Sequence, residues 1–423
     1  MLMEGFPPLP EARVTLANWQ LPPFNRWAFS HLREIVPTQR ISHGTGDSMA
    51  LPADPRPLDE VPTIRTDGTV ATVGAVLDTT YTDGVVVVHE GRRVFERYWG
   101  ETGPDTAHLL MSISKSFVGC VTGNLVDRGA LSTEQLVTEH LPELSASGYH
   151  GARVRDLLDM RSGIKFSEKY DDPEAEVRVF EQAALWKPRK REDGPASIYA
   201  YLQTLEAARE HGGAFEYRSC ETDVLGWVCE RAAGSRMADL ISGLVWTPLG
   251  AECDAEITCD GLGSAMHDGG MCATTADLAR FGVMLLRDGR AGGRQVVPAD
   301  WLAASWNPGP DVRDAFTASV DSPYLPGGWY RNQFWFLPRQ HGSVLLCLGI
   351  NGQMLYVDPA TETVVAKTSS WPVAQSPSML HDTLNAFDAV AATLTGHPPE
   401  GGPRQPGPPG VVAGMSRGRA TSF

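Results

Sequence analysis

Residues 112–127 read Ser-Ile-Ser-Lys-Ser-Phe-Val-Gly-Cys-Val-Thr-Gly-Asn-Leu-Val-Asp. Apolar side chains recur at the three- and four-residue spacing of a helix, and Gly129 ends the pattern. Ser112 and Lys115 are three positions apart, so they lie on one face of that predicted helix. A serine hydroxyl becomes a nucleophile when a base takes its proton, and a lysine that burial keeps partly neutral can act as that base. The stretch predicts Ser112 as a nucleophile at the first turn of a helix, beside Lys115.

This pattern does not decide the matter alone, because Ser162-Gly-Ile-Lys165 has the same spacing. That second match follows a predicted helix over 154–160 and contains a glycine, so its lysine need not face its serine. The alternative for the first match is a helix-capping hydroxyl at Ser112 and an exposed helix charge at Lys115.

Two other segments carry groups that acyl transfer requires. Tyr217 precedes a predicted helix that follows Ser219, and its phenol can relay a proton between the nucleophile and the leaving group. The segment Gly-Ile350-Asn-Gly, residues 349–352, follows an apolar strand, and its glycines allow a close approach of the backbone. The N–H groups of Ser112 and Ile350 are the predicted oxyanion donors. The alternatives are a tyrosine that anchors a turn and an ordinary strand-edge bulge.

Strand patterns lie toward both ends of the chain. A hairpin is predicted over 84–99, and short apolar stretches predict the strands 333–336, 343–348, 354–357 and 363–367, before a closing helix over 379–394. Helical patterns fill the middle. The expected fold is therefore α+β, with an antiparallel sheet made from both ends of the chain and covered by helices.

Four regions are expected along the chain. Residues 1–70 form an N-terminal arm packed on the body, and residues 71–164 together with 266–395 form an α/β domain. Residues 165–265 form a mostly helical domain. Residues 396–423, rich in Pro and Gly, form a disordered tail. The substrate is expected in the cleft between the two lobes.

The composition excludes several classes of function. The net charge of −15 over 423 residues argues against nucleic acid as a partner. Seven cysteines at irregular spacings, with no Cys-x-x-Cys or His-Glu-x-x-His motif, predict neither a disulfide framework nor a metal site, and no cofactor is expected. The N-terminus lacks a signal-peptide pattern and no apolar stretch is long enough to span a bilayer, which predicts a cytoplasmic protein without a membrane partner. A homodimer is left open.

The order Ser-x-x-Lys, Tyr-x-Ser and Gly-flanked strand resembles the serine β-lactamase and penicillin-binding superfamily. Residues 156–164, Asp-Leu-Leu-Asp-Met-Arg-Ser-Gly-Ile, and residues 269–282, which begin Gly-Gly-Met-Cys-Ala-Thr, are similar to two further segments of that superfamily. Within it, the chain most closely resembles the 6-aminohexanoate-dimer hydrolases, which cleave nylon oligomers. The stretches that carry this likeness are 19–29, 108–116, 215–219 and 222–227. The resemblance implies a three-layer α/β/α fold, β-lactamase/transpeptidase-like, with a helical lobe.

The resemblance also implies roles for individual residues. Ser112, Lys115 and Tyr217 become the catalytic set. Tyr170 matches a loop tyrosine that closes over the substrate amide. Glu181 lies where an acidic side chain can meet a substrate amine, although an exposed helix charge is an equal alternative.

Substrate contacts are also expected from Asn351 and Gly352. Residues 350–352 read Ile-Asn-Gly, whereas the corresponding segment in those hydrolases resembles Ile-His-Gly. Because an asparagine side chain does not titrate, any acid–base role of position 351 is lost.

The predicted function is a serine hydrolase that cleaves amide or ester bonds of small molecules, including carboxylesters, through an acyl-enzyme on Ser112. A β-lactamase or D,D-peptidase is the alternative among enzymes. It is disfavoured because Lys367-Thr-Ser lacks the glycine of a Lys-Thr-Gly box and comes one strand too late. The alternative of another class is a non-catalytic acyl-binding receptor.

Overall fold

The structure, a computed structural model, describes residues 2–190, 192–339 and 342–396. Apart from Gly396, the predicted disordered tail lies outside the described residues.

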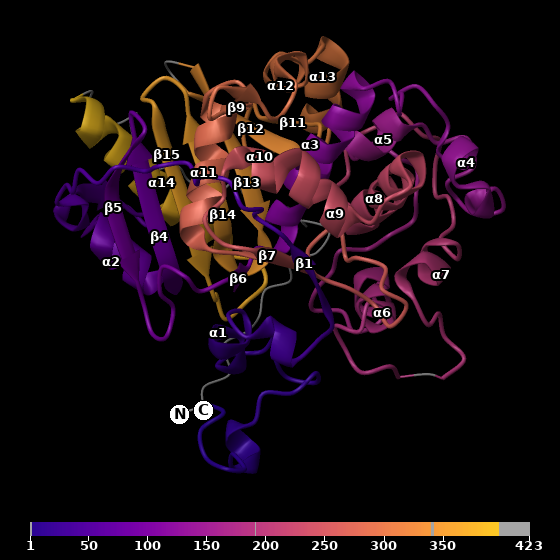
Figure 1. Cartoon of the computed structure of the whole chain (residues 1–423), viewed down its shortest axis with the longest axis horizontal. Coiled ribbons are helices and arrows are strands. Elements are labelled where there is room, and N and C mark those ends of the chain that lie inside the picture. Colours follow the sequence, from indigo (N-terminus) through magenta and orange to yellow (C-terminus); the bar gives the residue numbers. More distant parts are fainter. Residues whose placement is uncertain (1, 191, 340–341, 397–423) are drawn as a thin grey trace.

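A seven-stranded antiparallel sheet lies in one half of the molecule, on the left in Figure 1. Its strand order is β11-β12-β13-β14-β15-β4-β5. The strands are β4 (Thr82–His89), β5 (Arg92–Tyr98), β11 (Trp329–Arg331), β12 (Phe334–Arg339), β13 (Gly342–Gly349), β14 (Gln353–Asp358) and β15 (Thr363–Ser369). Because β15 pairs with β4, the sheet joins the two ends of the chain, as the strand patterns predicted.

Both faces of this sheet are covered by helices. Along β4, Val86 and Val88 belong to the hydrophobic cluster on the side of α11 (Thr275–Leu286), whereas Val85 and Val87 belong to a second cluster with α2 (Val73–Thr79) and α14 (Pro377–Thr395). This alternation is that of a strand buried on both faces. The predicted α+β fold, an antiparallel sheet covered by helices, is confirmed.

The remaining elements are mostly short and lie around these layers. They are α1 (Phe24–Ala28), β2 (Pro62–Ile64), β3 (Val70–Thr72), α4 (Val137–His140), α5 (Val154–Leu158), α6 (Glu176–Ala183), α7 (Ile198–Leu202), α8 (Ser219–Ala233), α9 (Met237–Ile241), α10 (Thr247–Leu249), β9 (Arg290–Ala291), β10 (Arg294–Gln295), α12 (Ala299–Trp306) and α13 (Pro310–Thr317). The division into domains stays a prediction.

A second sheet, which the sequence patterns did not predict, leads into the candidate site. Its order is β1 (Thr38–Ile41), β7 (Ala255–Thr258), β8 (Met271–Ala273) and β6 (His108–Leu109). Through this sheet the N-terminal arm pairs with β7, inside the region expected to be mostly helical. After β6, one 3₁₀ turn (Met111–Ile113) enters α3 (Ser114–Asp127). The sheet therefore fixes where the first turn of this central helix begins.

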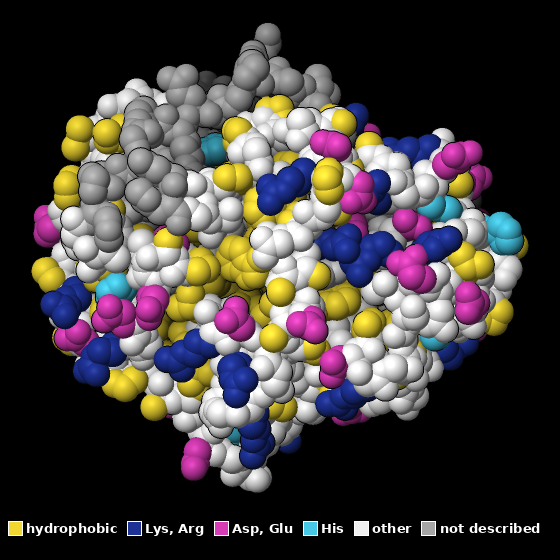
Figure 2. Space-filling model, turned by 90° about the horizontal axis from the view of Figure 1, so that it is seen from above, with side chains coloured by type: hydrophobic (Ala, Val, Ile, Leu, Met, Phe, Trp, Pro, Cys, Tyr) yellow, Lys and Arg dark blue, Asp and Glu magenta, His cyan; other side chains and the backbone are white. Residues whose placement is uncertain are grey.

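Seen from above, the surface is hollowed near its middle, where hydrophobic side chains are visible between acidic and basic ones (Figure 2). Over the described part of the chain, every helix is too short or too polar to cross a lipid bilayer.

Candidate active site

Ser112 and Lys115 meet as the spacing predicted. The Lys115 Nζ donates to the Ser112 Oγ at 2.9 Å, to the Ser219 Oγ at 3.1 Å and to the Asp268 carbonyl oxygen at 2.8 Å. Lys115 is only 1% exposed, so the alternative of an exposed helix charge is wrong. Neither the 3₁₀ turn nor α3 has a side-chain cap, so the capping alternative for Ser112 is wrong as well.

The charge state of Lys115 differs from the expectation. Burial by itself would lower its pKa, but Tyr217 and the carboxylates of Asp268, Glu168 and Asp223 outweigh burial and raise the pKa above its ordinary value. The Asp268 Oδ2 lies 3.5 Å from the Lys115 Nζ. These charges favour the ammonium form of Lys115, against the expectation that burial keeps it partly neutral.

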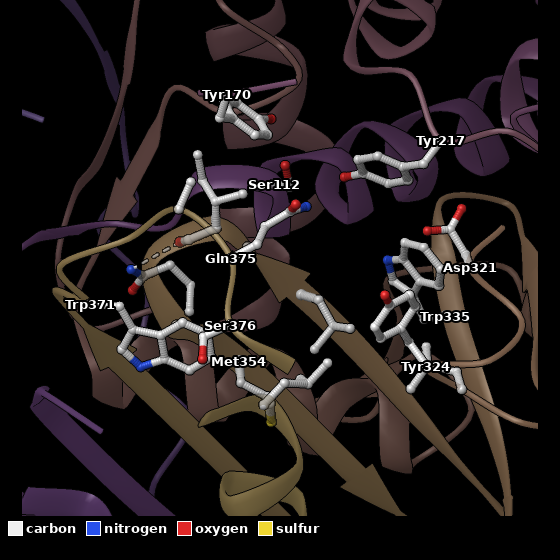
Figure 3. Close-up of a pocket in the computed structure, with 18 residues that line it drawn as sticks. Ser112, Tyr170, Tyr217, Asp321, Tyr324, Trp335, Met354, Trp371, Gln375 and Ser376 are labelled. Carbon is white, nitrogen blue, oxygen red and sulfur yellow. Dashed lines mark hydrogen bonds between the residues drawn. The ribbon is translucent and has the colours of Figure 1, made fainter. Parts of the chain in front are cut away.

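Tyr217 reaches the same place from the segment before α8. Its hydroxyl points toward Ser112 (Figure 3), and the Lys115 Nζ lies 5.2 Å from the centroid of its ring. The ring stacks on Trp335, with centroids 5.3 Å apart. Burial raises the pKa of the Tyr217 phenol, and the Lys115 ammonium and hydrogen bonding with Ser112 oppose that rise. The Tyr217 phenol thus points toward the Ser112 hydroxyl from the segment that precedes α8, and its ring is held by Trp335.

The second Ser-x-x-Lys match has a different geometry. The buried Ser162 hydroxyl donates to the Glu221 Oε1 at 2.5 Å, whereas Lys165 is exposed. The expectation that this lysine does not serve its serine is confirmed.

Glycine at position 349 allows the end of β13 to reach the turn that carries Ser112. A Cβ at Gly349 would lie 2.7 Å from the Leu110 carbonyl oxygen and 3.0 Å from the Met111 Cβ. Without that side chain, Ile350 lines the same cavities as Ser112. This approach is what an oxyanion donor at Ile350 requires.

Asn351 does not meet the expectation of a substrate contact. Its φ of 58° is left-handed, and its side-chain amide donates to the carbonyl oxygens of Trp371 at 2.9 Å and Val373 at 3.3 Å. It is absent from the walls of both cavities, so this prediction is corrected: Asn351 fastens the loop. Gly352 does line the larger cavity, at a φ of 88°.

Two cavities meet at Ser112. The larger has a volume of about 880 Å³ including its mouth, and the smaller about 320 Å³. Ser112, Tyr170 and Ile350 line both. Besides these, the walls of the larger cavity include Tyr217, Asp321, Tyr324, Leu325, Trp335, Leu348, Met354, Trp371 and Gln375. Those of the smaller include Met111, Val177, Phe180, Glu181, Trp186, Met266 and Asp268.

Tyr170 and Glu181 both line the smaller cavity, but they have different hydrogen-bond partners. The Tyr170 hydroxyl donates to the Glu168 Oε2 at 2.6 Å. Glu181 is only 3% exposed, so the alternative of an exposed helix charge is wrong. Both of its carboxylate oxygens accept from the Arg178 Nη1 at 2.8 Å, and the Lys187 Nζ lies 3.7 Å away. Glu181 is therefore already neutralised by cations of this chain.

Several contacts at the site were not found from sequence. Ser219 is the last residue of the Tyr-x-Ser motif, so the motif did hold a signal for it. Asp268 acts on Lys115 through its backbone carbonyl as well as its carboxylate, and a backbone contact leaves no residue-type signal. Asp321 and Trp335 line the larger cavity from segments in which no motif was recognised. Among the described residues, no three His, Cys, Asp or Glu side chains are grouped so as to hold a metal ion.

Comparisons with known proteins agree on one family. The family model described as Beta-lactamase matches residues 69–389. The 6-aminohexanoate-dimer hydrolase of Paenarthrobacter ureafaciens is 37% identical over 397 residues, which cover 91% of this chain and 97% of the relative.

Solved structures agree with the sequence relatives. A chain from Bacillus anthracis, described as a 6-aminohexanoate-dimer hydrolase, superimposes with a TM-score of 0.85 at 26% identity, covering 92% of this chain and 99% of that one. A family VIII carboxylesterase has a TM-score of 0.55 at 15% identity, covering 75% and 96%, and shares the fold.

Proposed function

From the premise that this chain belongs to the beta-lactamase family and is one of its serine hydrolases, we propose that Ser112 forms an acyl-enzyme with a small amide or ester substrate. The observation that carries the proposal is the contact of 2.9 Å between the Lys115 Nζ and the Ser112 Oγ, at a cavity also lined by Tyr217. A serine hydroxyl that contacts an ammonium, at a cavity that a phenol also lines, provides groups suited to acyl transfer.

Proton transfer in the first step is assigned to Tyr217. Since the surrounding charges favour the ammonium form of Lys115, its role is to favour the ionised form of the neighbouring phenol. The Tyr217 phenolate takes the proton of Ser112 while the serine oxygen attacks the carbonyl carbon. The same phenol then donates that proton to the leaving amine or alcohol, and the bond to the leaving group breaks.

The oxyanion of each tetrahedral intermediate is assigned to the N–H groups of Ser112 and Ile350. Preorganised donors of this kind supply a large part of the acceleration in acyl transfer. Water enters where the leaving group was, Tyr217 takes its proton, and hydrolysis of the acyl-enzyme returns the Ser112 hydroxyl.

For the substrate, the relative at 37% identity supports a linear amide such as 6-aminohexanoate dimer, with carboxylesters cleaved by the same steps. A β-lactam with its carboxylate is disfavoured. Lys367 is fully buried, donates to the Thr80 carbonyl oxygen at 3.3 Å and to the Ser369 hydroxyl, and has its pKa lowered by burial to about 7. It is absent from the walls of both cavities and does not offer a charge to such a substrate.

Location and assembly remain part of the proposal. The seven cysteine thiols are unpaired and six of them are buried, which supports a reducing, cytoplasmic compartment. A homodimer stays a prediction.

The test is a panel of p-nitrophenyl esters, 6-aminohexanoate dimer and nitrocefin, assayed with the native protein and with Ser112→Ala. We expect turnover of esters and dimer, and a loss of about 10⁴-fold or more in kcat for Ser112→Ala. A fluorophosphonate should label the native protein and Ser162→Ala but not Ser112→Ala. Full activity of Ser112→Ala contradicts the proposal, and a burst without turnover favours an acyl-binding receptor.

A further inference from the structure

Asp321 is an acidic side chain of the larger cavity to which no role has been assigned. It lies in the segment between α13 and β11 and lines the same cavity as Ser112. In Figure 3 its carboxyl group lies beside Trp335, on the far side of Tyr217 from Ser112. Within the described residues, this carboxylate has no hydrogen-bond donor and no basic side chain in contact with it.

The charges around Asp321 are of its own sign. Burial, together with the negative charges of Glu216 and Glu168, raises its pKa to about 7. A carboxylate in this position gains most from a cation that arrives with the substrate. Glu181, which lines the smaller cavity and does not contact Lys115, already has Arg178 and Lys187 as cationic partners.

The walls next to Asp321 suit a cation carried on an alkyl chain. Tyr217, Tyr324 and Trp335 place aromatic rings at this end, and ring faces attract ammonium groups. Leu325 and Met354 add apolar surface that can pack against methylene groups. A neutral or anionic group placed here would leave the Asp321 carboxylate uncompensated.

We propose that Asp321 is a specificity-determining residue that binds a primary ammonium on the leaving-group side of the substrate. The side follows from the proposed function, on which this inference rests: Tyr217 hands its proton to the leaving group, so the leaving group lies beside Tyr217 and extends toward Asp321. Among leaving groups, Asp321 therefore favours an amino alcohol or a diamine over the 6-aminohexanoate leaving group of the dimer, whose carboxylate it would repel.

The test compares 6-aminohexyl butyrate with heptyl butyrate, an ester of similar length without the charge. The quantity measured is the ratio of their kcat/KM values. We expect the native protein to favour the amino ester and Asp321→Asn to lower the ratio by roughly tenfold or more, the effect of removing one charged partner of a hydrogen bond. Asp321→Glu should restore part of the preference.

Asp314→Asn is the matched control, because it removes the same charge from an exposed position of α13 outside the cavity. It should leave the ratio unchanged, and thermal unfolding of each variant reports whether the fold is kept. An unchanged ratio in Asp321→Asn overturns the inference. If the native protein hydrolyses neither ester and no fluorophosphonate labels Ser112, the proposed function has failed instead.

Discussion

The two cavities that meet at Ser112 both contain carboxylates, but among residues 2–190, 192–339 and 342–396 counter-charges to them are found at the smaller cavity alone. There Glu181 is held by Arg178, and Asp268 lies 3.5 Å from the Lys115 Nζ. In the larger cavity the Asp321 carboxylate faces aromatic rings, and no cation among the described residues contacts it. An acidic residue at a site therefore indicates cation binding only when the protein itself leaves its charge uncompensated.

The largest effect is expected from Tyr217→Phe, which tests whether the leaving group lies in the larger cavity. This substitution keeps the ring stacked on Trp335 and removes the hydroxyl. We expect kcat/KM for heptyl butyrate, which reports formation of the acyl-enzyme, to fall by about 10²- to 10⁴-fold, because the alkoxide leaves poorly without a proton. The loss should be smaller for a p-nitrophenyl ester, whose phenolate needs no proton to leave. Steady-state kinetics with both esters measure the difference.

Tyr330→Phe is the control for this variant, since Tyr330 packs beside Tyr217 but donates its hydroxyl to the Gln333 Oε1 at 3.1 Å. Equal losses on the two esters in Tyr217→Phe would mean that Tyr217 does not protonate the leaving group. The leaving group would then have no reason to lie toward Asp321.

Asp268→Asn tests the counter-charge in the smaller cavity. The carboxylate raises the pKa of Lys115, and activity requires the Lys115–Tyr217 pair to have lost one proton, so kcat/KM should increase with pH. Removing this negative charge lowers the pKa of Lys115, so the rising limb should move to lower pH, by about one unit. Profiles from pH 6 to 10 at constant ionic strength measure the shift. Asp314→Asn should leave the rise of kcat/KM with pH where it is in the native protein. If this rise does not move in Asp268→Asn, the ionisation that controls the rate is not that of the Lys115–Tyr217 pair.

The sequence predicted what depends on local spacing. Ser112 and Lys115 are neighbours because a helix places residues three apart on one face, and the strands of the central sheet other than β11 followed from apolar runs and alternation. β1 and β7 were missed because their sequences, Thr-Gln-Arg-Ile and Ala-Glu-Ile-Thr, do not form apolar runs.

The errors concern features that distant segments create. The charge on Lys115 depends on Glu168, Asp223 and Asp268, which only the fold brings close. For Asn351, the residue type was visible, but the left-handed backbone that turns its amide away from the cavity was not. The sequence could not predict that the Asp321 carboxylate lacks a cationic partner among the described residues, because this depends on which side chains the fold places around it.

The difference between the two cavities should become smaller when the Glu181 carboxylate of the smaller cavity loses its cationic partner. Arg178→Gln removes the cation that contacts both oxygens of Glu181 and leaves only Lys187 at 3.7 Å. We expect the ratio of kcat/KM for p-nitrophenyl 6-aminohexanoate over p-nitrophenyl heptanoate to rise by roughly three- to tenfold, because an acyl-side ammonium then meets a carboxylate that has lost its closest cation. Arg178 also donates to the Tyr170 carbonyl oxygen, so absolute rates can fall while the ratio still reports charge recognition. Adding Glu181→Gln should cancel the gain; a gain that survives in the double variant would mean that the loosened loop, and not the freed carboxylate, changed the specificity.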